Sequence, residues 1–403
     1  MEWKLKDLTV DGKGSYGIGA SAVPYQEDKL TYLRITDIND DGSLNFSDLK
    51  SVDAEDAEKY ILKENDIVFA RTGNSTGRSY FYEKQHGTFV YAGFLIKFSL
   101  DPNKVNPRIL KYYTHSKPYY DWVSSFDTGA TRGNINAKTY GDMEIELPSR
   151  KIQNRIVSIL SSLDRKIELN NKINDDLEEM AQAIFKNWFV DFEPFKDGKF
   201  VDSELGMIPE GWKVGTLGEF CKCLLGGTPS RSKEEYWNGD VNWINSGEIN
   251  KFRILEASEK ITELGLAKSA TKLLPKKTTV LAITGATLGQ VSLLEIDTCA
   301  NQSVIGVLEN TEVPYEYIYP FIKDRIEMLI QHQTGGAQQH INKDNVESLI
   351  FLLPTINVLE DYISLVSPMY KRIESQCFEN LYLSLLRDTL LPRLMSGEIE
   401  VPE

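Results

Sequence analysis

The chain has 403 residues, a hydrophobic fraction of 41%, a charged fraction of 26% and a formal net charge of −14. This size suits two or three domains, and four cysteines without a spaced framework argue against a secreted disulfide scaffold. The N-terminus does not resemble a signal peptide and no apolar run has membrane-spanning length, so we expect a cytoplasmic protein with no membrane partner. The acidic balance argues mildly against nucleic acid, so a DNA partner requires a local basic face or additional subunits.

Residues 1–148 alternate short β-like runs with turn residues, and we expect a helix around residues 107–125. The runs are rich in β-branched or aromatic residues and lie at 32–35, 67–70 and 94–98. This pattern predicts a mixed α+β domain.

Residues 149–191 carry a heptad pattern without Gly or Pro, which predicts one long helix packed against another helix. Ser149 suits the N-cap, and Glu193-Pro194 ends the pattern. One seven-residue series holds Ile156, Leu163, Asn170, Leu177 and Ile184. The interleaved series holds Ile152, Ile159, Lys166, Ile173 and Met180.

The rest of the chain repeats this plan. It divides into a linker at 192–211, a second domain at 212–354, a second long helix at 355–397 and a tail at 398–403. In the second domain we expect strands near 280–284 and 303–308 and a helix around 315–332. The second helix aligns its two series as Tyr362, Met369, Gln376, Leu383 and Leu390, and as Val358, Leu365, Arg372, Glu379 and Leu386.

Short motifs support an internal duplication of a globular domain followed by a long helix. Val68-Phe69-Ala70-Arg71-Thr72-Gly73 matches Val280-Leu281-Ala282-Ile283-Thr284-Gly285, and Ile135-Asn136 matches Ile341-Asn342. Arg165-Lys166-Ile167-Glu168 matches Lys371-Arg372-Ile373-Glu374 at corresponding points of the two helices. Shared polar interruptions of an apolar seam arise by chance less readily than shared leucines.

Catalytic and metal-binding motifs are missing from the sequence. Cys221-Lys222-Cys223 has no second Cys or His pair at zinc-ligand spacing, so two ordinary strand residues are the simpler interpretation. The glycine-rich run Leu225–Pro229 lacks the Gly-Lys-Ser/Thr of a phosphate loop. We therefore expect no catalytic residues, no metal site and no cofactor in this chain.

Two duplicated loops combine small residues with Arg, Asn, Gln and Thr, the side chains that hydrogen-bond phosphates and base edges. Polar turns that cap strands and contact only water are the alternative interpretation. The candidate DNA-contacting residues of the first domain are Arg71, Thr72, Asn74, Thr76, Arg78, Arg132, Asn134, Asn136 and Lys138. Those of the second domain are Arg231, Thr284, Thr287, Gln290, Gln338, Gln339, His340 and Lys343.

The motifs Gly226–Ser232, Tyr236–Val241 and Gly247-Glu248-Ile249, with Phe185–Phe192 and Leu391–Ile399, give the whole chain a resemblance to a known family. The chain resembles the specificity (S) subunit of type I restriction–modification systems. The family often has Glu-Gln early in each long helix, where this chain has Gln153-Asn154 and Leu359-Glu360.

This resemblance implies two target-recognition domains separated by a pair of long antiparallel coiled-coil helices, an α+β fold with internal duplication. It implies that each domain reads one half of a gapped site in double-stranded DNA. The helices would set the spacing and dock two modification subunits, which carry the S-adenosylmethionine chemistry. Restriction subunits would complete an ATP- and Mg-dependent nuclease.

In such an antiparallel helix pair, the polar residues near the middle of one helix face those near the middle of the other. We predict that Lys166 contacts Glu374 and that Arg372 contacts Glu168, in one polar layer with Asn170 and Gln376 that fixes the register. The alternative is that these charges flank the seam in solvent and contribute little.

Two alternative functions make different demands on the sequence. A fused methyltransferase–specificity chain lacks the required S-adenosylmethionine and catalytic motifs. A duplicated coiled-coil scaffold that binds protein instead of DNA stays open on sequence chemistry. Neutralising Arg71, Arg78 and Arg132 separates the scaffold from a DNA reader, because DNA affinity and its salt dependence depend on phosphate contacts. The target sequence itself does not follow from these residues.

Overall fold

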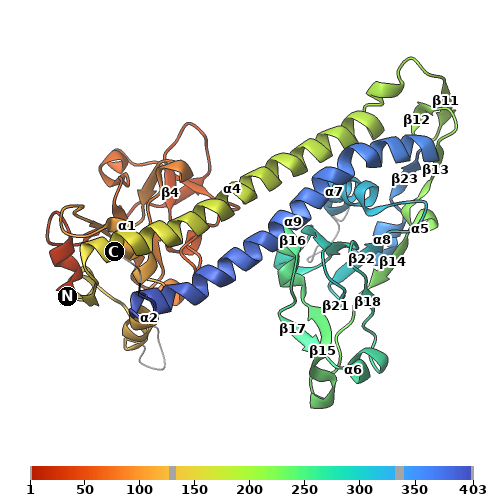
Figure 1. Ribbon diagram of the computed structural model, residues 1–403. Helices are drawn as coiled ribbons and strands as arrows, with labels where there is room; N and C mark the ends of the chain where they lie inside the picture. Colours follow the sequence, from red (N-terminus) through yellow and green to blue (C-terminus); the bar gives the residue numbers. More distant parts are fainter. Residues whose placement is uncertain (1, 127–132, 332–339, 401–403) are drawn as a thin grey trace. The chain divides into compact units, whose positions relative to one another are not determined.

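The computed structural model describes residues 2–126, 133–331 and 340–400 (Figure 1). It forms two compact units, each containing one globular domain and parts of both long helices. Unit 1 is Met1–Lys166 with Leu383–Glu403, and unit 2 is Ile167–Tyr382. Among the described residues, no helix combines the length and apolar character that crossing a bilayer requires.

The domain of unit 1 has two four-stranded sheets, ordered β2-β9-β6-β7 and β3-β5-β4-β8, and a two-stranded sheet β1-β10. The central strand β6 is buried throughout: Ile67, Val68 and Phe69 are apolar, and the carboxylate of Asp66 pairs with Lys97 at 3.3 Å. The strands are β1 (Glu2–Lys4), β2 (Ser15–Tyr16), β3 (Ala22–Pro24), β4 (Thr31–Leu33), β5 (Lys50–Val52), β6 (Asp66–Ala70), β7 (Ser79–Phe81), β8 (Phe89–Tyr91), β9 (Leu95–Ser99) and β10 (Glu144–Glu146).

The described residues of this domain also form the short α-helices α1 (Pro107–Tyr113), α2 (Lys117–Ser124) and α3 (Ala137–Gly141). The single helix predicted over residues 107–125 is wrong in one respect, because it is interrupted after Tyr113. Ser116 occupies the N-cap of α2, and Pro118 sits in its first turn, where a missing N–H costs nothing.

The domain of unit 2 has a five-stranded sheet β14-β22-β19-β20-β16, a four-stranded sheet β17-β15-β21-β18 and a two-stranded sheet β13-β23. Its strands are β13 (Lys213–Thr216), β14 (Lys222–Leu225), β15 (Trp237–Ile244), β16 (Arg253–Ile254), β17 (Glu259–Ile261), β18 (Leu273–Leu274), β19 (Thr279–Ala282), β20 (Val291–Leu294), β21 (Thr298–Ala300), β22 (Val304–Leu308) and β23 (Ile350–Leu353). Its helices are α5 (Leu217–Phe220), α6 (Glu263–Ala267), α7 (Tyr315–Gln331) and α8 (Lys343–Glu347). The helix predicted around 315–332 therefore forms.

The predicted duplication is confirmed in the strand order. In both domains the first and last strands pair antiparallel, as β1 with β10 and as β13 with β23. The order β2-β9-β6-β7 recurs as β14-β22-β19-β20. The parallel pair β4–β8 recurs as β15–β21. Equivalent strands therefore carry the equivalent loops of the two domains.

The two long helices are α4 (Arg150–Phe189) and α9 (Ile356–Met395), which agree with the predicted spans 149–191 and 355–397. The second heptad series was assigned to the seam wrongly: Ile159, Met180, Leu365 and Leu386 are 38–51% exposed. The buried face of α9 instead holds Leu359, Tyr362, Val366, Tyr370, Ile373 and Cys377. Several of these side chains pack into the core of the domain. Helix α9 therefore buries side chains against the domain as well as against the other helix, and the buried positions recur with the 3.6-residue period of an α-helix.

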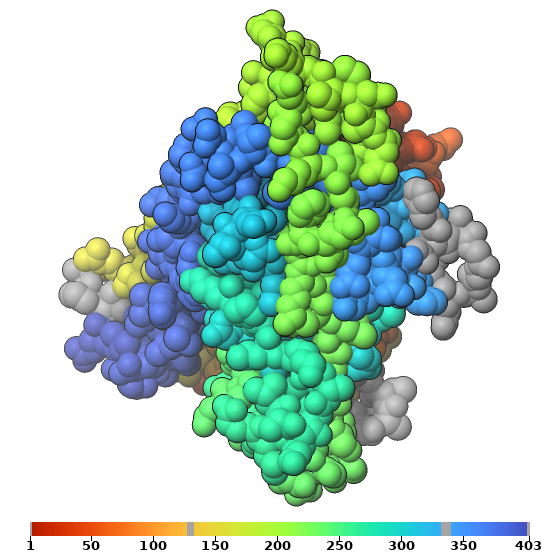
Figure 2. Space-filling model, turned by 90° about the vertical axis from the view of Figure 1, so that its right-hand side faces the viewer, coloured from red at the N-terminus to blue at the C-terminus, as the bar shows by residue number. Residues whose placement is uncertain are grey.

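Unit 2 is held by an aromatic core where the end of α4 meets the start of α9 and the helix α7. Phe189 lies 4.7 Å from Tyr317 and 4.8 Å from Tyr362, measured between ring centroids in edge-to-face geometry. The linker after α4, in the yellow-green region at the top of Figure 2, forms a hairpin of β11 (Phe200–Ser203) and β12 (Gly206–Pro209).

Candidate nucleic-acid interface

In unit 1 the two duplicated loops lie next to each other. The N–H of Ile135 donates to the carbonyl of Arg71 at 3.0 Å, and Ile135 itself is fully buried. The second domain repeats this contact, with the N–H of Ile341 donating to the carbonyl of Ile283 at 3.0 Å. Residues that are far apart in sequence therefore form one surface in each domain.

The first loop has the same backbone in both domains. Gly73 and Gly285 have φ values of 71° and 74°, and Gly77 and Gly289 have φ values of 88° and 83°. These positive angles favour glycine, because a side chain there crowds the backbone. One loop scaffold thus presents two different sets of side chains.

Arg71 lies at the centre of a small polar cluster in unit 1. Its guanidinium carbon is 5.1 Å from the ring centroid of Tyr16, and its Nε donates to Oδ1 of Asn134 at 3.4 Å. The hydroxyl of Tyr16 in turn accepts from the N–H of Ala137 at 3.1 Å. The cluster of Tyr16, Arg71 and Asn134, called the Arg71 cluster below, joins both loops to strand β2.

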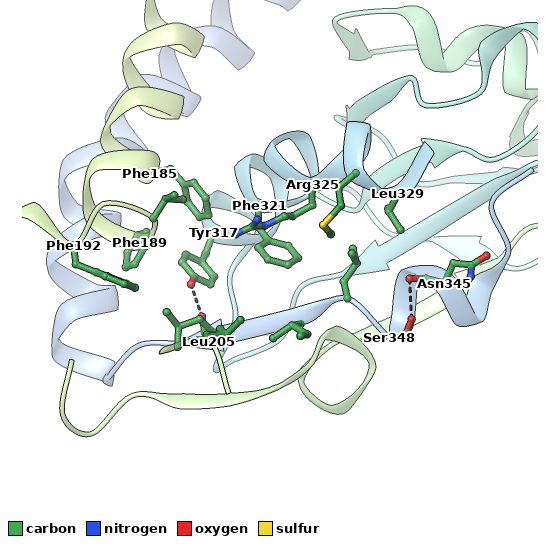
Figure 3. A pocket seen from close by; sticks show the side chains of 15 residues that line it. Phe185, Phe189, Phe192, Leu205, Tyr317, Phe321, Arg325, Leu329, Asn345 and Ser348 are labelled. Carbon is green, nitrogen blue, oxygen red and sulfur yellow. Dashed lines mark hydrogen bonds between the residues drawn. The ribbon is translucent and has the colours of Figure 1, made fainter. Parts of the chain in front are cut away.

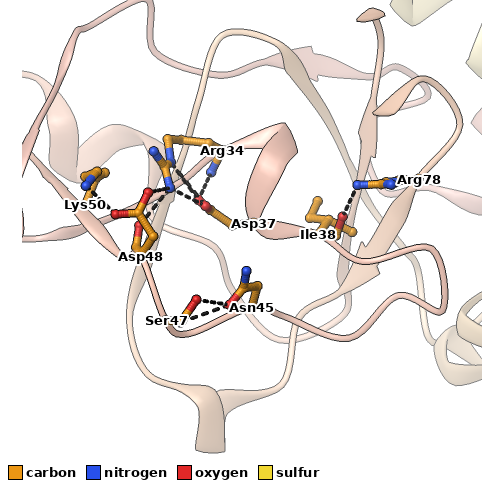
Figure 4. Close-up of polar contacts among 8 residues, drawn as sticks. All are labelled: Arg34, Asp37, Ile38, Asn45, Ser47, Asp48, Lys50 and Arg78. Atoms are coloured by element: carbon orange, nitrogen blue, oxygen red, sulfur yellow. Dashed lines mark hydrogen bonds and ion pairs between the residues drawn. The ribbon is translucent and has the colours of Figure 1, made fainter. Parts of the chain in front are cut away.

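Arg78 has partners within the chain. Its Nε donates to Oδ1 of Asp40 at 2.7 Å. Its Nη1 donates to the carbonyl of Ile38 at 3.0 Å, as Figure 4 shows. Arg34 supports the same segment, since its Nη2 donates to Asp37 and to the carbonyl of Asp48. Arg78 therefore positions the segment that carries Asp40, and its contact with DNA stays a prediction.

The Ile-Asn motif has a structural role in both copies. Oδ1 of Asn136 accepts from the N–H of Thr139 at 3.0 Å and caps α3. Oδ1 of Asn342 accepts from the N–H of Asn345 at 2.8 Å and caps α8. The isoleucine anchors the loop in the core and the asparagine starts the helix, so the cap occupies the oxygen of Asn136.

The remaining candidates of unit 1 differ in exposure. Asn74 and Lys138 are exposed, whereas Thr72 and Thr76 are half-buried. The hydroxyl of Thr76 donates to the carbonyl of Gly73 at 2.8 Å, which closes the first loop. Arg132 lies outside the described residues.

Among the candidates of unit 2, Arg231 has defined partners on both its guanidinium edge and its face. Arg231 forms a bidentate pair with Glu259, and its guanidinium carbon is 3.6 Å from the ring centroid of Trp237. Lys343 pairs with Glu347 at 3.0 Å. Gln290 and His340 are exposed, Thr284 and Thr287 are half-buried, and Gln338 and Gln339 lie outside the described residues.

The described residues show no group of three or more His, Cys, Asp or Glu side chains able to hold a metal ion. Cys221 and Cys223 are buried, and burial raises the pKa of each thiol to about 12. A cavity of about 600 Å³ in unit 2 is lined mainly by apolar and aromatic side chains from α4, α7 and the linker (Figure 3). Phe192 and Leu205 of the linker line it, so it lies where the linker packs on the domain.

The middle of the helix pair contains a polar layer in unit 2. Asn170 and Gln376 are buried, and Nε2 of Gln376 donates to Oδ1 of Asn170 at 3.1 Å. Glu374 pairs with Lys277 at 3.0 Å and also with Lys276. Arg372 is exposed. The contacts of Lys166 with Glu374 and of Arg372 with Glu168 stay predictions.

Sequence reasoning missed the two carboxylates that fix each domain to α4. Asp164 accepts from the hydroxyl of Tyr112 at 2.9 Å in unit 1, and Glu178 accepts from the hydroxyl of Tyr319 at 2.6 Å in unit 2. Both carboxylates are buried. Their spacing of three or four residues from buried apolar positions such as Leu160 and Ala181 was the available signal.

Comparisons with known proteins agree with this architecture. A family model described as a type I restriction modification DNA specificity domain matches residues 6–179 and 209–376. The specificity subunit of the type I restriction enzyme MjaIX from Methanocaldococcus jannaschii is 28% identical over 299 residues, covering 73% of this chain and 69% of that protein. The HindI specificity subunit from Haemophilus influenzae is 24% identical over 405 residues, covering 85% of this chain and 88% of that protein. A crystal structure of an S subunit from M. genitalium shares the fold, with a TM-score of 0.58 and 15% sequence identity. The match covers 98% of this chain and 96% of that one.

Proposed function

Since the chain belongs to the type I restriction–modification DNA specificity family, we propose that it selects the DNA target for a type I complex and performs no chemistry itself. Each recognition domain reads one half of a gapped site. The observation that carries this proposal is the pair of loops with one backbone and two sets of side chains, because a duplicated scaffold with divergent polar residues suits two half-sites of different sequence. A duplicated scaffold that binds only protein finds no support among the relatives, which are specificity subunits.

The partners follow from the same assignment. Two modification subunits dock on the paired helices and supply the S-adenosylmethionine chemistry, and restriction subunits supply the ATP- and Mg-dependent cleavage. The net charge of −14 is compatible with this role if the other subunits contribute the positive charge that encloses the DNA. The α4–α9 pair sets the distance between the half-sites.

The test is a methylome. This chain is expressed with its neighbouring modification subunit in a host that lacks DNA methylation, and modified adenines are mapped by sequencing. We expect one gapped motif with two defined halves. Replacing residues 212–354 by the corresponding domain of a relative should change one half and leave the other. A complex that forms but leaves every adenine unmodified contradicts the proposal.

A further inference from the structure

The two domains differ most informatively at the Arg71 cluster. Tyr16 is opposite Ile96 in the β2–β9 ladder, and Leu225 is opposite Ile305 in the equivalent β14–β22 ladder. Arg71 directly follows β6, and Ile283 directly follows β19. The structurally equivalent positions therefore hold Tyr and Arg in the first domain but Leu and Ile in the second.

The surroundings of Arg71 restrict its side chain without hiding it. Tyr16 is 43% exposed and lies within cation–π distance of the guanidinium, while Asn134 holds Nε from the second loop. Within the described ranges, the two terminal nitrogens of Arg71 donate to no other side chain. A guanidinium held at Nε presents its terminal N–H groups as a planar fork, and less rotamer entropy is lost when that fork binds.

We infer that Arg71 reads a guanine in the half-site bound by the first domain, by donating two hydrogen bonds to O6 and N7 in the major groove. This inference rests on the proposed function. Arginine bidentate to guanine is the commonest specific contact to a base edge, because the fork matches these two acceptors. The second domain has no arginine at the equivalent position, so its half-site is read there by other chemistry.

The experiment compares methylomes of the wild-type complex with those of Arg71→Ala and Arg71→Lys. Exchange of residues 212–354 first identifies which half of the motif belongs to the first domain. We expect both variants to accept other bases at one G·C position of that half, with discrimination reduced roughly tenfold or more. Lysine keeps the charge but lacks the fork, so it separates base reading from phosphate contact.

Two further variants keep the result interpretable. Lys59→Ala removes an exposed cation of the same unit that lies outside both loops and both long helices, and it should leave the motif unchanged. Tyr16→Leu installs the residue of the second domain and should reduce discrimination at the same position by a smaller factor. The yield of assembled complex is measured for every variant.

Three outcomes overturn the inference. The first is a wild-type half-site for this domain without any G·C pair. The second is a uniform fall in methylation in Arg71→Ala with an unchanged motif, particularly if Arg71→Lys behaves as wild type, since that pattern indicates a phosphate contact. The third is relaxation confined to the other half. Failure of the wild type to yield a bipartite motif contradicts the proposed function itself, and the inference with it.

Discussion

In both recognition domains a tyrosine hydroxyl donates to a carboxylate of helix α4, but the cations that balance this carboxylate differ. In unit 1 the carboxylate of Asp164 accepts from Tyr112, and in unit 2 that of Glu178 accepts from Tyr319. The two tyrosines lie in the corresponding helices α1 and α7. Duplication has therefore preserved a tyrosine–carboxylate bond at the junction between domain and helix.

The difference lies in how the negative charge is balanced. Glu178 pairs with Arg253, whose side chain is 1% exposed, and with Lys323. Asp164 pairs with Lys111 and Arg387, whose side chains are each 25% exposed. Burial disfavours the charged form and so raises the pKa of both carboxylates. The neighbouring cations have the larger combined effect and hold the pKa of each carboxylate below its usual range. The junction of unit 2 thus depends on a buried pair, whereas that of unit 1 depends on two partly exposed cations.

The largest predicted effect is therefore at Arg253. Arg253→Ala leaves Glu178 buried without its closest cation, and we expect a loss of about 3–5 kcal/mol in the stability of unit 2. Chemical denaturation measures the loss, and hydrogen exchange of the β16 and β20 peptides locates it. Lys323→Ala removes a half-exposed cation from the same carboxylate and should cost less than about 1 kcal/mol.

A double variant separates the pair from its surroundings. Glu178→Leu with Arg253→Met removes both charges while filling the space, and we expect it to recover most of the stability lost in Arg253→Ala. Equal costs for Arg253→Ala and Lys323→Ala would show that burial does not distinguish these two cations.

The junction of unit 1 should be less sensitive. Asp164→Asn weakens charge-assisted bonds, but Arg387 still reaches Asp388 at 2.9 Å, so we expect a cost of about 2 kcal/mol. Since the folded pKa of Asp164 is lowered, its contribution is complete above the unfolded value of about 4 and is lost as pH falls through the folded pKa. As the pH is lowered, the free energy of unfolding should therefore fall less steeply in Asp164→Asn than in the wild type. A variant that follows the wild-type acid profile contradicts this assignment.

The loop glycines give a finer comparison between the copies. A Cβ at Gly77 would lie 2.5 Å from Cγ1 of Val123, and one at Gly289 would lie 2.4 Å from Cδ1 of Ile330. The end of an isoleucine moves more easily than a valine methyl next to the backbone. We expect Gly77→Ala to cost about 2 kcal/mol and Gly289→Ala about 1 kcal/mol, measured by thermal unfolding.

Matched controls exist in the same loops. Gly73 and Gly285 also have positive φ, but a Cβ at either meets nothing within 4 Å. Alanine at these two positions should cost the same in both domains, because only the backbone conformation contributes. A clear difference between them would mean that the two loops do not share one scaffold.

Much of this architecture was predictable from local pattern. The duplication, both long helices and the central strands followed from repeated motifs and apolar periodicity, which depend on neighbours in sequence. Arg71 was a candidate, but its support by Tyr16 was not predicted, because β2 has only two residues and gives no periodic signal.

What failed required tertiary information. Asp164 and Glu178 were not singled out from the sequence, since the cations that pair with them come from elements distant in sequence. The contact of Arg78 with DNA stays a prediction, but its pairing with Asp40 joins residues 38 positions apart and could not be predicted from local pattern. The second heptad series failed because each helix also packs on a domain, so one seven-residue rule did not describe its buried face.

The smallest predicted effect on stability concerns the polar layer, and its consequence should appear in function. Asn170 donates through Nδ2 to Glu379 at 2.7 Å and to Asn380 at 2.8 Å, and it accepts from Gln376. In unit 1 the same two helices contribute Ile156, Leu160, Leu391 and Leu394 to one apolar cluster, and Arg387 of α9 pairs with Asp164 of α4 at 3.2 Å. A shift in register therefore breaks both this ion pair and the hydrogen bonds of the polar layer, of which the polar layer is the more deeply buried.

Replacing the layer by leucine tests this idea. Asn170→Leu with Gln376→Leu should change stability by less than about 1 kcal/mol, because both buried polar groups are removed together. The methylome should then show sites whose gap differs from the wild-type length, since the helices are no longer held to one register. Leu391→Met, a volume-conserving change in the apolar half, should keep the original gap. If the double leucine variant methylates only sites with the wild-type gap, apolar packing and the Asp164–Arg387 pair set the spacing without the polar layer, which then serves the fold of unit 2.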